Sequence, residues 1–281
     1  MSRLILPRRF NRQPQYPAQI DWSNPATETL QFAVNLVNGI PATDAAKGRP
    51  VIRYPSNLSA SQYLQTAGNL GRGPQFNYAS TGYIECATST AQWGTPLEAS
   101  ALIAFLKNND GSDTSIWTLG NTGYSSGGSD FLYGGQWYTD AFWQTRWLSA
   151  INPPAGYDVT KPTILGVTVK NGRQAAFING QLWYTATQTG NFYLPPTLWF
   201  GTNSSGVNNG SSSFCIVTAA AAWSSAISDA TMLSLTENPW QIFRAPRRYW
   251  SFAPEQSYQR DLRQCRQALT SAAPAQTPRI G

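Results

Sequence analysis

Most apolar residues of this chain fall in short runs that are separated by polar turns, a pattern typical of β-strands. The clearest example is the segment 163–185, in which three apolar runs are separated by Asn171-Gly172 and Asn179-Gly180. Asn-Gly between two such runs is the strongest short-range signal for a β-hairpin, because both central turn positions need a positive φ. The segment therefore predicts a three-stranded antiparallel meander.

Further strand-like runs lie on both sides of this meander. They cover residues 30–37, 83–87, 99–106, 116–120, 199–201 and 214–218. A helix is expected after Ser228, which is a good N-cap, and Asn238-Pro239 should end it. A second helix is expected over 255–272, where Tyr258, Leu262, Cys265 and Leu269 would share one face.

The two end segments differ from the body in composition and charge. Residues 1–25 are rich in Pro, Arg and Gln, which predicts an extended arm. Residues 1–19 carry a net charge of +4 and residues 244–281 carry +5, whereas residues 20–243 carry −3. We therefore predict an arm at 1–25, a sandwich over 26–243 and a basic tail over 244–281. Basic tails suit an acidic protein surface, and a nucleic-acid partner is not expected, because such binders carry their basic face on the folded body.

Composition removes several classes of catalytic chemistry. The chain contains no histidine, which excludes Ser-His-Asp and Cys-His triads and the zinc motif HExxH. It also lacks the GxxxxGK[ST] phosphate loop. The three cysteines form no CxxC pair and fit small buried apolar residues. We therefore expect a protein that is not an enzyme.

A polysaccharide hydrolase is kept as a lesser alternative, because two converging carboxylates would suffice for glycoside hydrolysis. The candidate acids are Glu85, Glu98, Asp110, Asp113, Asp130, Asp140 and Asp158. Most of them lie beside Gly, Ser or Asn, where turn formation explains them.

No cofactor or membrane segment is expected. The run 108–113 carries closely spaced oxygen ligands that calcium takes, but it lacks the EF-hand pattern and fits a tight turn. No stretch approaches the roughly 20 apolar residues of a membrane helix. The apolar run near Met1 is too short for a signal peptide, so the protein is expected to be made and kept in a cytoplasm.

Aromatic residues are abundant and are concentrated between Phe131 and Trp147, beside a Gly/Ser-rich loop over 121–135. Exposed aromatic rings suit the faces of sugars, while core packing is the alternative role for each ring. The candidate glycan-binding residues are Trp137, Tyr138, Trp143 and Trp147. Trp183 and Tyr184 are adjacent in a predicted strand, so they should point to opposite faces and at most one should belong to the core.

The segment 163–243 resembles the last third of a LamG-type, concanavalin A-like jelly-roll domain. The motifs that carry the resemblance are Phe177-Ile178-Asn179-Gly180-Gln181, Phe200-Gly201, Ala222-Trp223 and Ile227-Ser228-Asp229-Ala230. The resemblance implies a two-sheet antiparallel jelly-roll sandwich, whose concave face often binds glycans in cellular relatives. The calcium ligands of those relatives have no matching positions here.

Both end segments also resemble tailed-bacteriophage structural proteins of this fold. The matching residues are Gln13 to Pro17, Ile20 to Pro25, Glu237 to Phe243 and Ala245 to Arg248. The middle of the chain, 40–160, matches only as strands and turns. This resemblance implies a virion location, as a tail-tip, fibre or head-surface protein, and a homo-oligomer within a symmetric assembly.

Under this hypothesis the two basic ends dock on other virion proteins, although packing of both ends on their own sandwich is the alternative. The predicted docking residues are Arg8, Arg9, Arg12, Tyr16, Arg244, Arg247, Arg248, Tyr249 and Trp250. The other functional alternative is an adsorption protein that recognises a host surface glycan.

Overall fold

The structure is a computed structural model, and part of the chain is described from it. The described residues are 10–15, 18–39, 42–54, 64–76, 83–87, 98–107, 114–120, 132–137, 140–145, 156–158, 160–170, 172–187, 197–200 and 215–244. The predicted helix over 255–272 and the predicted calcium turn at 108–113 lie outside them. The division into arm, sandwich and tail stays a prediction.

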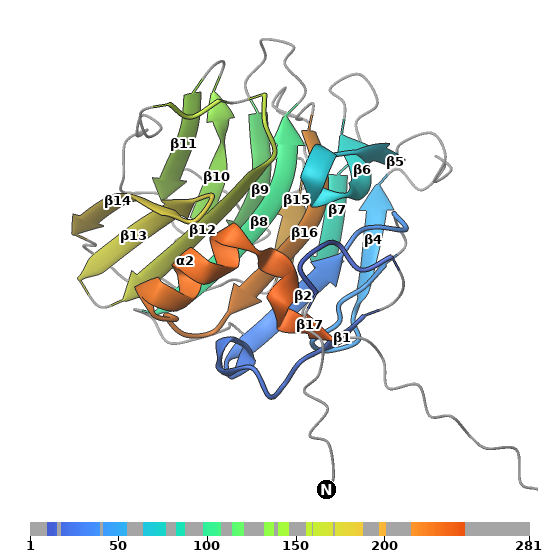
Figure 1. The fold of residues 1–281 in the computed structure, drawn as a ribbon, viewed down its shortest axis with the longest axis horizontal. Coiled ribbons are helices and arrows are strands. Elements are labelled where there is room, and N and C mark those ends of the chain that lie inside the picture. The colour runs from blue at the N-terminus through green and yellow to red at the C-terminus, as the bar shows by residue number, and fades with distance from the viewer. Residues whose placement is uncertain are drawn as a thin grey trace, which may run out of the picture. The chain divides into compact units, whose positions relative to one another are not determined.

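Two antiparallel sheets make up most of the described chain (Figure 1). The larger has eight strands: β2 (Leu30–Asn35), β5 (Leu64–Thr66), β6 (Arg72–Phe76), β8 (Ala99–Lys107), β12 (Thr163–Lys170), β13 (Arg173–Ile178), β14 (Gln181–Thr187) and β16 (Cys215–Trp223). The other has seven: β3 (Ala42–Thr43), β4 (Pro50–Tyr54), β7 (Tyr83–Ala87), β9 (Thr114–Gly120), β10 (Leu132–Trp137), β11 (Asp140–Thr145) and β15 (Thr197–Phe200). The prediction of an all-β, two-sheet antiparallel sandwich is confirmed, and the arrangement is consistent with a jelly roll.

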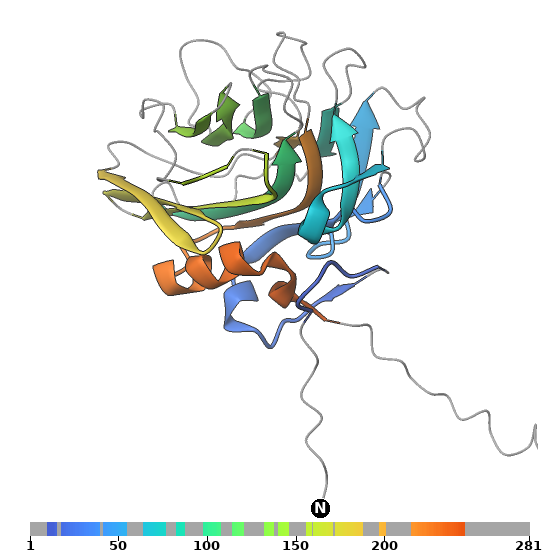
Figure 2. The ribbon, with the colours of Figure 1, turned by 45° about the horizontal axis from the view of Figure 1, so that its top comes forward.

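The larger sheet is covered on both faces, so the described part of the fold has three layers (Figure 2). Alternate residues of β8 show this: Ile103 and Phe105 belong to the core between the sheets, whereas Leu102 packs on the opposite face with helix residues. All nine residues of β16 are buried, as expected for a central strand without a solvated face. Its neighbours are β2, β6 and β8.

The predicted meander is present as β12, β13 and β14, which pair antiparallel in this order. Asn179 and Gly180 have φ values of 47° and 78°, as the two-residue turn requires. Gly172 also has a positive φ, at 76°. The predicted three-stranded antiparallel meander is therefore confirmed.

The predicted helix after Ser228 is present as α2 (Asp229–Glu237), and it covers the outer face of β12 (Figure 1). The Ser228 hydroxyl accepts a hydrogen bond from the amide of Thr231 at 3.1 Å, which caps the first turn. A methyl group at Gly166 of β12 would lie 2.4 Å from Met232 Sδ, so the absent side chain lets the helix approach the sheet. The 3-10 helix η4 (Pro239–Ile242) follows α2 directly.

The motif around Asn238 joins the two ends of the described chain. The Asn238 carboxamide accepts from the amide of Trp240 and donates to the carbonyl of Phe10, both at 3.1 Å. Trp240 is buried under this turn, and Asn24 donates to the carbonyl of Gln241 at 3.1 Å. Two short strands, β1 (Gln19–Ile20) and β17 (Phe243–Arg244), pair beside it. The conspicuous Asn-Pro-Trp-Gln sequence is therefore a structural clip.

Residues 10–15, within the predicted arm, lie on the sandwich. Gln13 is 5% exposed, and its carboxamide pairs with both backbone groups of Arg72, each at 2.6 Å. The same carboxamide donates to Asn35 Oδ1 at 3.1 Å, and Asn35 donates to the carbonyl of Pro14 at 2.8 Å. For these residues the structure shows packing on the chain's own sandwich.

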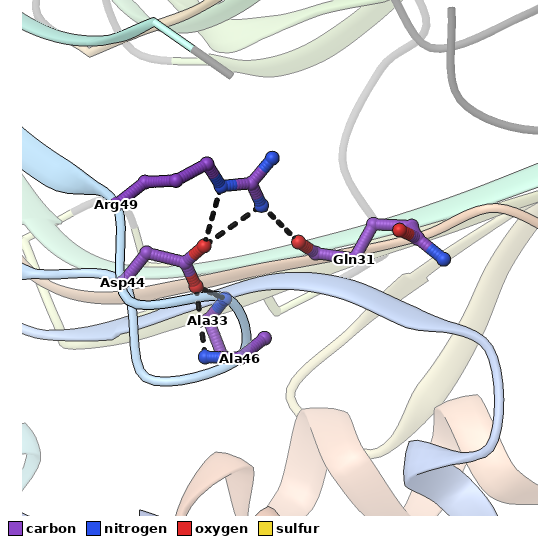
Figure 3. Close-up of polar contacts among 5 residues, drawn as sticks. All are labelled: Gln31, Ala33, Asp44, Ala46 and Arg49. Atoms are coloured by element: carbon purple, nitrogen blue, oxygen red, sulfur yellow. Dashed lines mark hydrogen bonds and ion pairs between the residues drawn. The ribbon is translucent and has the colours of Figure 1, made fainter. Parts of the chain in front are cut away.

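A buried carboxylate fastens the turn between β3 and β4 to strand β2 (Figure 3). Asp44 Oδ1 accepts from the amides of Ala33 and Ala46, both at 2.9 Å. Asp44 Oδ2 contacts the Arg49 guanidinium at 2.7 and 2.8 Å, and Arg49 also donates to the carbonyl of Gln31. Because β2 lies in one sheet and β3 and β4 in the other, this clip ties the sheets together.

Candidate ligand-binding site

Three half-buried aromatic side chains lie at the β14 edge of the larger sheet. Tyr157, Trp183 and Tyr184 all pack against the core between the sheets while keeping part of their surface accessible. We call these three residues the aromatic edge. Strand β14 is the last strand of its sheet in the described chain, so the rings lie at the margin of the sandwich.

A β-bulge explains why Trp183 and Tyr184 lie on the same face. Tyr184 is opposite Ala176, but the next pair joins Leu182 to Phe177, so Trp183 is the extra residue. The expectation that these two side chains point to opposite faces was therefore wrong, because both pack against the same core cluster, although neither is fully buried in it. Strict alternation places neighbouring side chains on opposite faces, and the bulge interrupts it. Leu182 follows the outer face and is 50% exposed.

A small pocket adjoins the aromatic edge at the turn between β13 and β14. Its volume is about 230 Å³. It is lined by Gly156, Tyr157, Asp158, Lys161, Ile178, Asn179 and Gln181. Tyr157 belongs to both the pocket and the aromatic edge, and Ile178 belongs to the core cluster against which Trp183 and Tyr184 pack. The pocket thus combines one ring face with carboxylate, ammonium and carboxamide groups.

The polar walls of the pocket are held in place by the two chain segments that form it. Asn179 Oδ1 accepts from the amide of Ile164 at 2.7 Å, and the amide of Gly180 donates to Thr236 Oγ1 at 3.2 Å. The Tyr157 hydroxyl is 2.7 Å from Thr163 Oγ1. These contacts fix the turn and the Tyr157 ring before any ligand arrives, which lowers the entropic cost of binding.

Asp158 organises the loop on the other side of the pocket. Its Oδ1 accepts from the amide of Thr160 at 2.9 Å and from the Thr160 hydroxyl at 2.6 Å. These hydrogen bonds, with a smaller contribution from Lys161, lower the pKa of Asp158 below its ordinary value of 3.8. Asp158 therefore carries a negative charge at neutral pH and serves as an acceptor.

A buried carboxamide lies on the inner face of β13, close to the aromatic edge. Gln174 precedes Ala176 by two positions, so both side chains point to the face that carries Tyr184. Gln174 is fully buried, and neither atom of its carboxamide has a hydrogen-bond partner within the described chain. Buried amides of this kind are uncommon and cost about 1–3 kcal/mol when unpaired.

The described residues do not test the glycan-binding site predicted from the sequence. Trp137 ends β10, opposite Asp140, and Trp143 lies in β11, opposite Gly134. For these two strands the description covers the backbone. Tyr138 and Trp147 lie outside the described residues, so this site stays a prediction. Sequence reasoning missed the aromatic edge, because the bulge that forms it has no local signal in β14.

Two of the predicted docking residues lie within the described chain. Arg12 is exposed on the segment 10–15, and Arg244 is half-buried in β17, opposite Gln19. Arg244 Nε is buried and has no hydrogen-bond partner in the described ranges. The other predicted docking residues, Arg8, Arg9, Tyr16, Arg247, Arg248, Tyr249 and Trp250, fall outside these ranges.

The described residues contain no cluster of three or more acidic, cysteine or histidine side chains able to hold a metal ion. Cys215 is buried in the core between the sheets. Within the same ranges, no helix is long and apolar enough to cross a membrane.

No protein-family model matches the chain, and no curated protein sequence matches it. Its fold is similar to several solved structures. One is domain 4 of AbnA, an extracellular GH43 arabinanase from Geobacillus stearothermophilus, in complex with arabinotriose. The TM-score is 0.52 at 10% identity, over 79% of this chain and 100% of that domain.

Two further structures show the same similarity. The binding domain of botulinum neurotoxin serotype D has a TM-score of 0.51 at 11% identity, over 75% of this chain and 51% of that one. Trypanosoma rangeli sialidase in complex with the inhibitor DANA has a TM-score of 0.50 at 11% identity, over 75% of this chain and 33% of the sialidase. The chain thus spans about half of the toxin domain and a third of the sialidase. These similarities establish the β-sandwich fold.

Proposed function

We propose that this chain is a non-enzymatic binding protein that recognises a carbohydrate at the aromatic edge. The observation that carries the proposal is the bulge in β14, which turns Trp183 and Tyr184 to one face beside Tyr157 and a polar pocket. Flat aromatic rings pack against the apolar faces of sugars, and nearby carboxamides bind their hydroxyls. Gln181 and Asn179 supply such groups in the pocket wall.

The comparison with the arabinanase domain supports this proposal. That domain has the same sandwich fold along its whole length and was solved with arabinotriose. The size of the pocket also fits, because about 230 Å³ accommodates part of an oligosaccharide while the rest lies along the accessible rings.

The test is binding of the intact chain to an array of neutral oligosaccharides that includes arabinotriose. Trp183→Ala and Tyr184→Ala should each weaken binding of the best oligosaccharide by roughly tenfold or more, the loss expected for a central aromatic contact. Leu182→Ala is the matched control, because Leu182 is exposed on the same strand and follows the opposite face. Its affinity should stay within about twofold of the parent.

Two results would reject the proposal. One is that no oligosaccharide of the array binds. The other is that Leu182→Ala weakens binding as much as Trp183→Ala does, since the loss would then follow general disturbance of β14. The melting temperature of each variant shows whether weaker binding comes from a lost contact with the ligand or from a less stable fold.

A structural role in a bacteriophage particle is the second candidate function. The pairing of β1 with β17 favours it, because Gln19 lies opposite Arg244 and the chain segments before and after the sandwich are joined there. Residues 1–9 carry a net charge of +3 and residues 245–281 carry +4, whereas the whole chain carries +6. Both segments are thus attached at one place, which suits joint docking on an acidic surface of another virion protein.

Deletion of residues 1–9 and 245–281 tests this second candidate. The shortened protein should fold, because the clip around Asn238 and the β1–β17 pair remain. It should fail to enter particles, and an antibody against 101–240 should label only particles that carry the full chain. Normal incorporation of the shortened protein would contradict the docking role.

A further inference from the structure

Residues 10–15 form a fixed arch beside the 3-10 helix η2 (Gly68–Leu70). One end is held where the carbonyl of Phe10 accepts from Asn238 Nδ2 at 3.1 Å. The other end is held by the buried Gln13, which forms two hydrogen bonds of 2.6 Å with the backbone of Arg72. Between these points Asn11 and Arg12 are exposed. The backbone that carries both side chains is therefore positioned in advance.

A groove of about 770 Å³ lies between the arch and η2. Its lining consists of residues 10–15 with Gly68, Asn69 and Gly71. Gly71 has a φ of 90°, and a methyl group there would lie 2.0 Å from Gln13 Oε1, so glycine allows the arch to seat this closely. The volume falls within the range of about 300–1,000 Å³ that is usual for ligand sites.

The groove presents polar side chains that form no hydrogen bond or ion pair with other described residues. Arg12, Asn11 and Asn69 are exposed, and none of the three side chains has a hydrogen bond or ion pair with another described residue. The guanidinium offers a planar fork of donors that matches a carboxylate. Each carboxamide offers a donor and an acceptor, which suits a hydroxyl group. The half-buried Phe10 adds an aromatic wall.

We propose that this groove is a second binding site and that it takes a saccharide unit bearing a carboxylate, such as a hexuronic acid. Arg12 binds the carboxylate, and Asn11 and Asn69 bind ring hydroxyls. A saccharide fits better than an acidic peptide, because the described residues of the lining supply one cation among several carboxamides. The inference rests on the proposed function for its ligand class, but its residues are separate from the aromatic edge.

The experiment is a calorimetric titration of the intact chain with trigalacturonic acid. Its fully methyl-esterified form has the same ring system without charge, and a glutamate tripeptide with blocked termini carries the same number of carboxylates without sugar. We expect the free acid to bind at least roughly tenfold more tightly than the ester, which cannot form charge-assisted hydrogen bonds with Arg12, and than the peptide, which lacks the ring hydroxyls that Asn11 and Asn69 bind.

Arg12→Ala should weaken binding of trigalacturonic acid by roughly tenfold or more. Arg72→Ala is the matched control, since Arg72 is also exposed and near the arch but does not line the groove and keeps its backbone bonds to Gln13. It should change the affinity by less than about twofold, because a surface charge outside the site contributes little. Trp183→Ala should also leave this affinity unchanged.

Four results would overturn the inference: no binding of the free acid, equal binding of its ester, equal binding of the peptide, or equal losses in Arg12→Ala and Arg72→Ala. The proposal for the groove and the proposal for the aromatic edge can be rejected independently of each other. If Trp183→Ala abolishes neutral oligosaccharide binding while Arg12→Ala leaves acid binding intact, the groove is wrong and the proposed function stands. If Trp183→Ala abolishes binding of the free acid, both ligands use the aromatic edge and the groove is again wrong.

Discussion

At the scale of single residues, the contacts of Asp44 account for its burial. Both carboxylate oxygens are used, one by the amides of Ala33 and Ala46 and the other by Arg49. A charge with no exposed surface survives in a protein interior only when it is paired and hydrogen-bonded in this way. Asp44 is thus a fastening between sheets and has no free oxygen for catalysis.

Replacement of Asp44 by Ala should therefore be severe. It leaves the mostly buried Arg49 guanidinium and two amides without their acceptor, which we expect to cost about 3–5 kcal/mol of unfolding free energy. Urea denaturation followed by tryptophan fluorescence measures this loss. Glu28→Ala is the control, because Glu28 is exposed and its carboxylate has no hydrogen bond or ion pair with another described residue, so this change should alter stability by less than about 0.5 kcal/mol. Similar stabilities of the two variants would show that the clip does not hold the sheets.

Gln174 leads to the opposite expectation. Its carboxamide is buried without a partner in the described chain, so Leu, which has similar volume and no polar group, should be better tolerated. We expect Gln174→Leu to raise the unfolding free energy by about 1–2 kcal/mol. Urea denaturation again gives the value. A loss of stability would mean that the amide has a partner, such as an ordered water, that the described contacts do not include.

At the scale of elements, the sequence predicts regular features well. The Asn-Gly turns mark the meander, and Ser228 with Asn238-Pro239 marks both ends of α2, because these signals act over a few neighbouring residues. The bulge at Trp183 depends on how two strands register against each other. The buried position of Gln13 depends on hydrogen bonds with Arg72, which is 59 residues away, so no local sequence pattern reveals it.

The packing of α2 on the larger sheet makes Gly166 a sensitive position. A methyl group there would approach Met232 Sδ to 2.4 Å and Thr236 Cγ2 to 2.8 Å. We expect Gly166→Ala to cost about 1–3 kcal/mol, since the helix must shift or the side chains must leave their preferred rotamers. Met232→Ala in the same background should recover part of this loss by making room. Additive losses in the double variant would contradict this packing argument.

At the scale of the whole described molecule, segments near the two ends of the described residues contribute to the fold. Ile20 and Phe243 are each 1% exposed, and their strands pair with one another beside the motif at Asn238. The charge pattern of residues 1–25 suggests a separate arm, but charge does not reveal the buried Gln13 and Ile20 within it. Composition alone therefore does not reveal that these two side chains are buried.

Two truncations should show which part of the N-terminal segment stabilises the fold and which part does not. Removal of residues 1–9 should change the unfolding free energy by less than about 1 kcal/mol, because it keeps the hydrogen bonds of Phe10 and Gln13 that hold this segment on the sandwich. Removal of residues 1–24 also deletes Gln13 and Ile20 and should cost at least about 3 kcal/mol through lost burial and unpaired backbone groups. Calorimetric melting compares both with the full chain. Equal melting temperatures would refute the structural role of residues 10–24.

The most direct test of the proposed carbohydrate site is a nuclear magnetic resonance titration of the full chain with the oligosaccharide that binds best in the array. Binding at the aromatic edge predicts saturable shifts of the Trp183 indole N–H and of backbone amides in β14 and in 156–161, with little change at 10–15 and 68–71. Shifts confined to other parts of the chain, or no saturable shifts with any oligosaccharide of the array, would contradict the account.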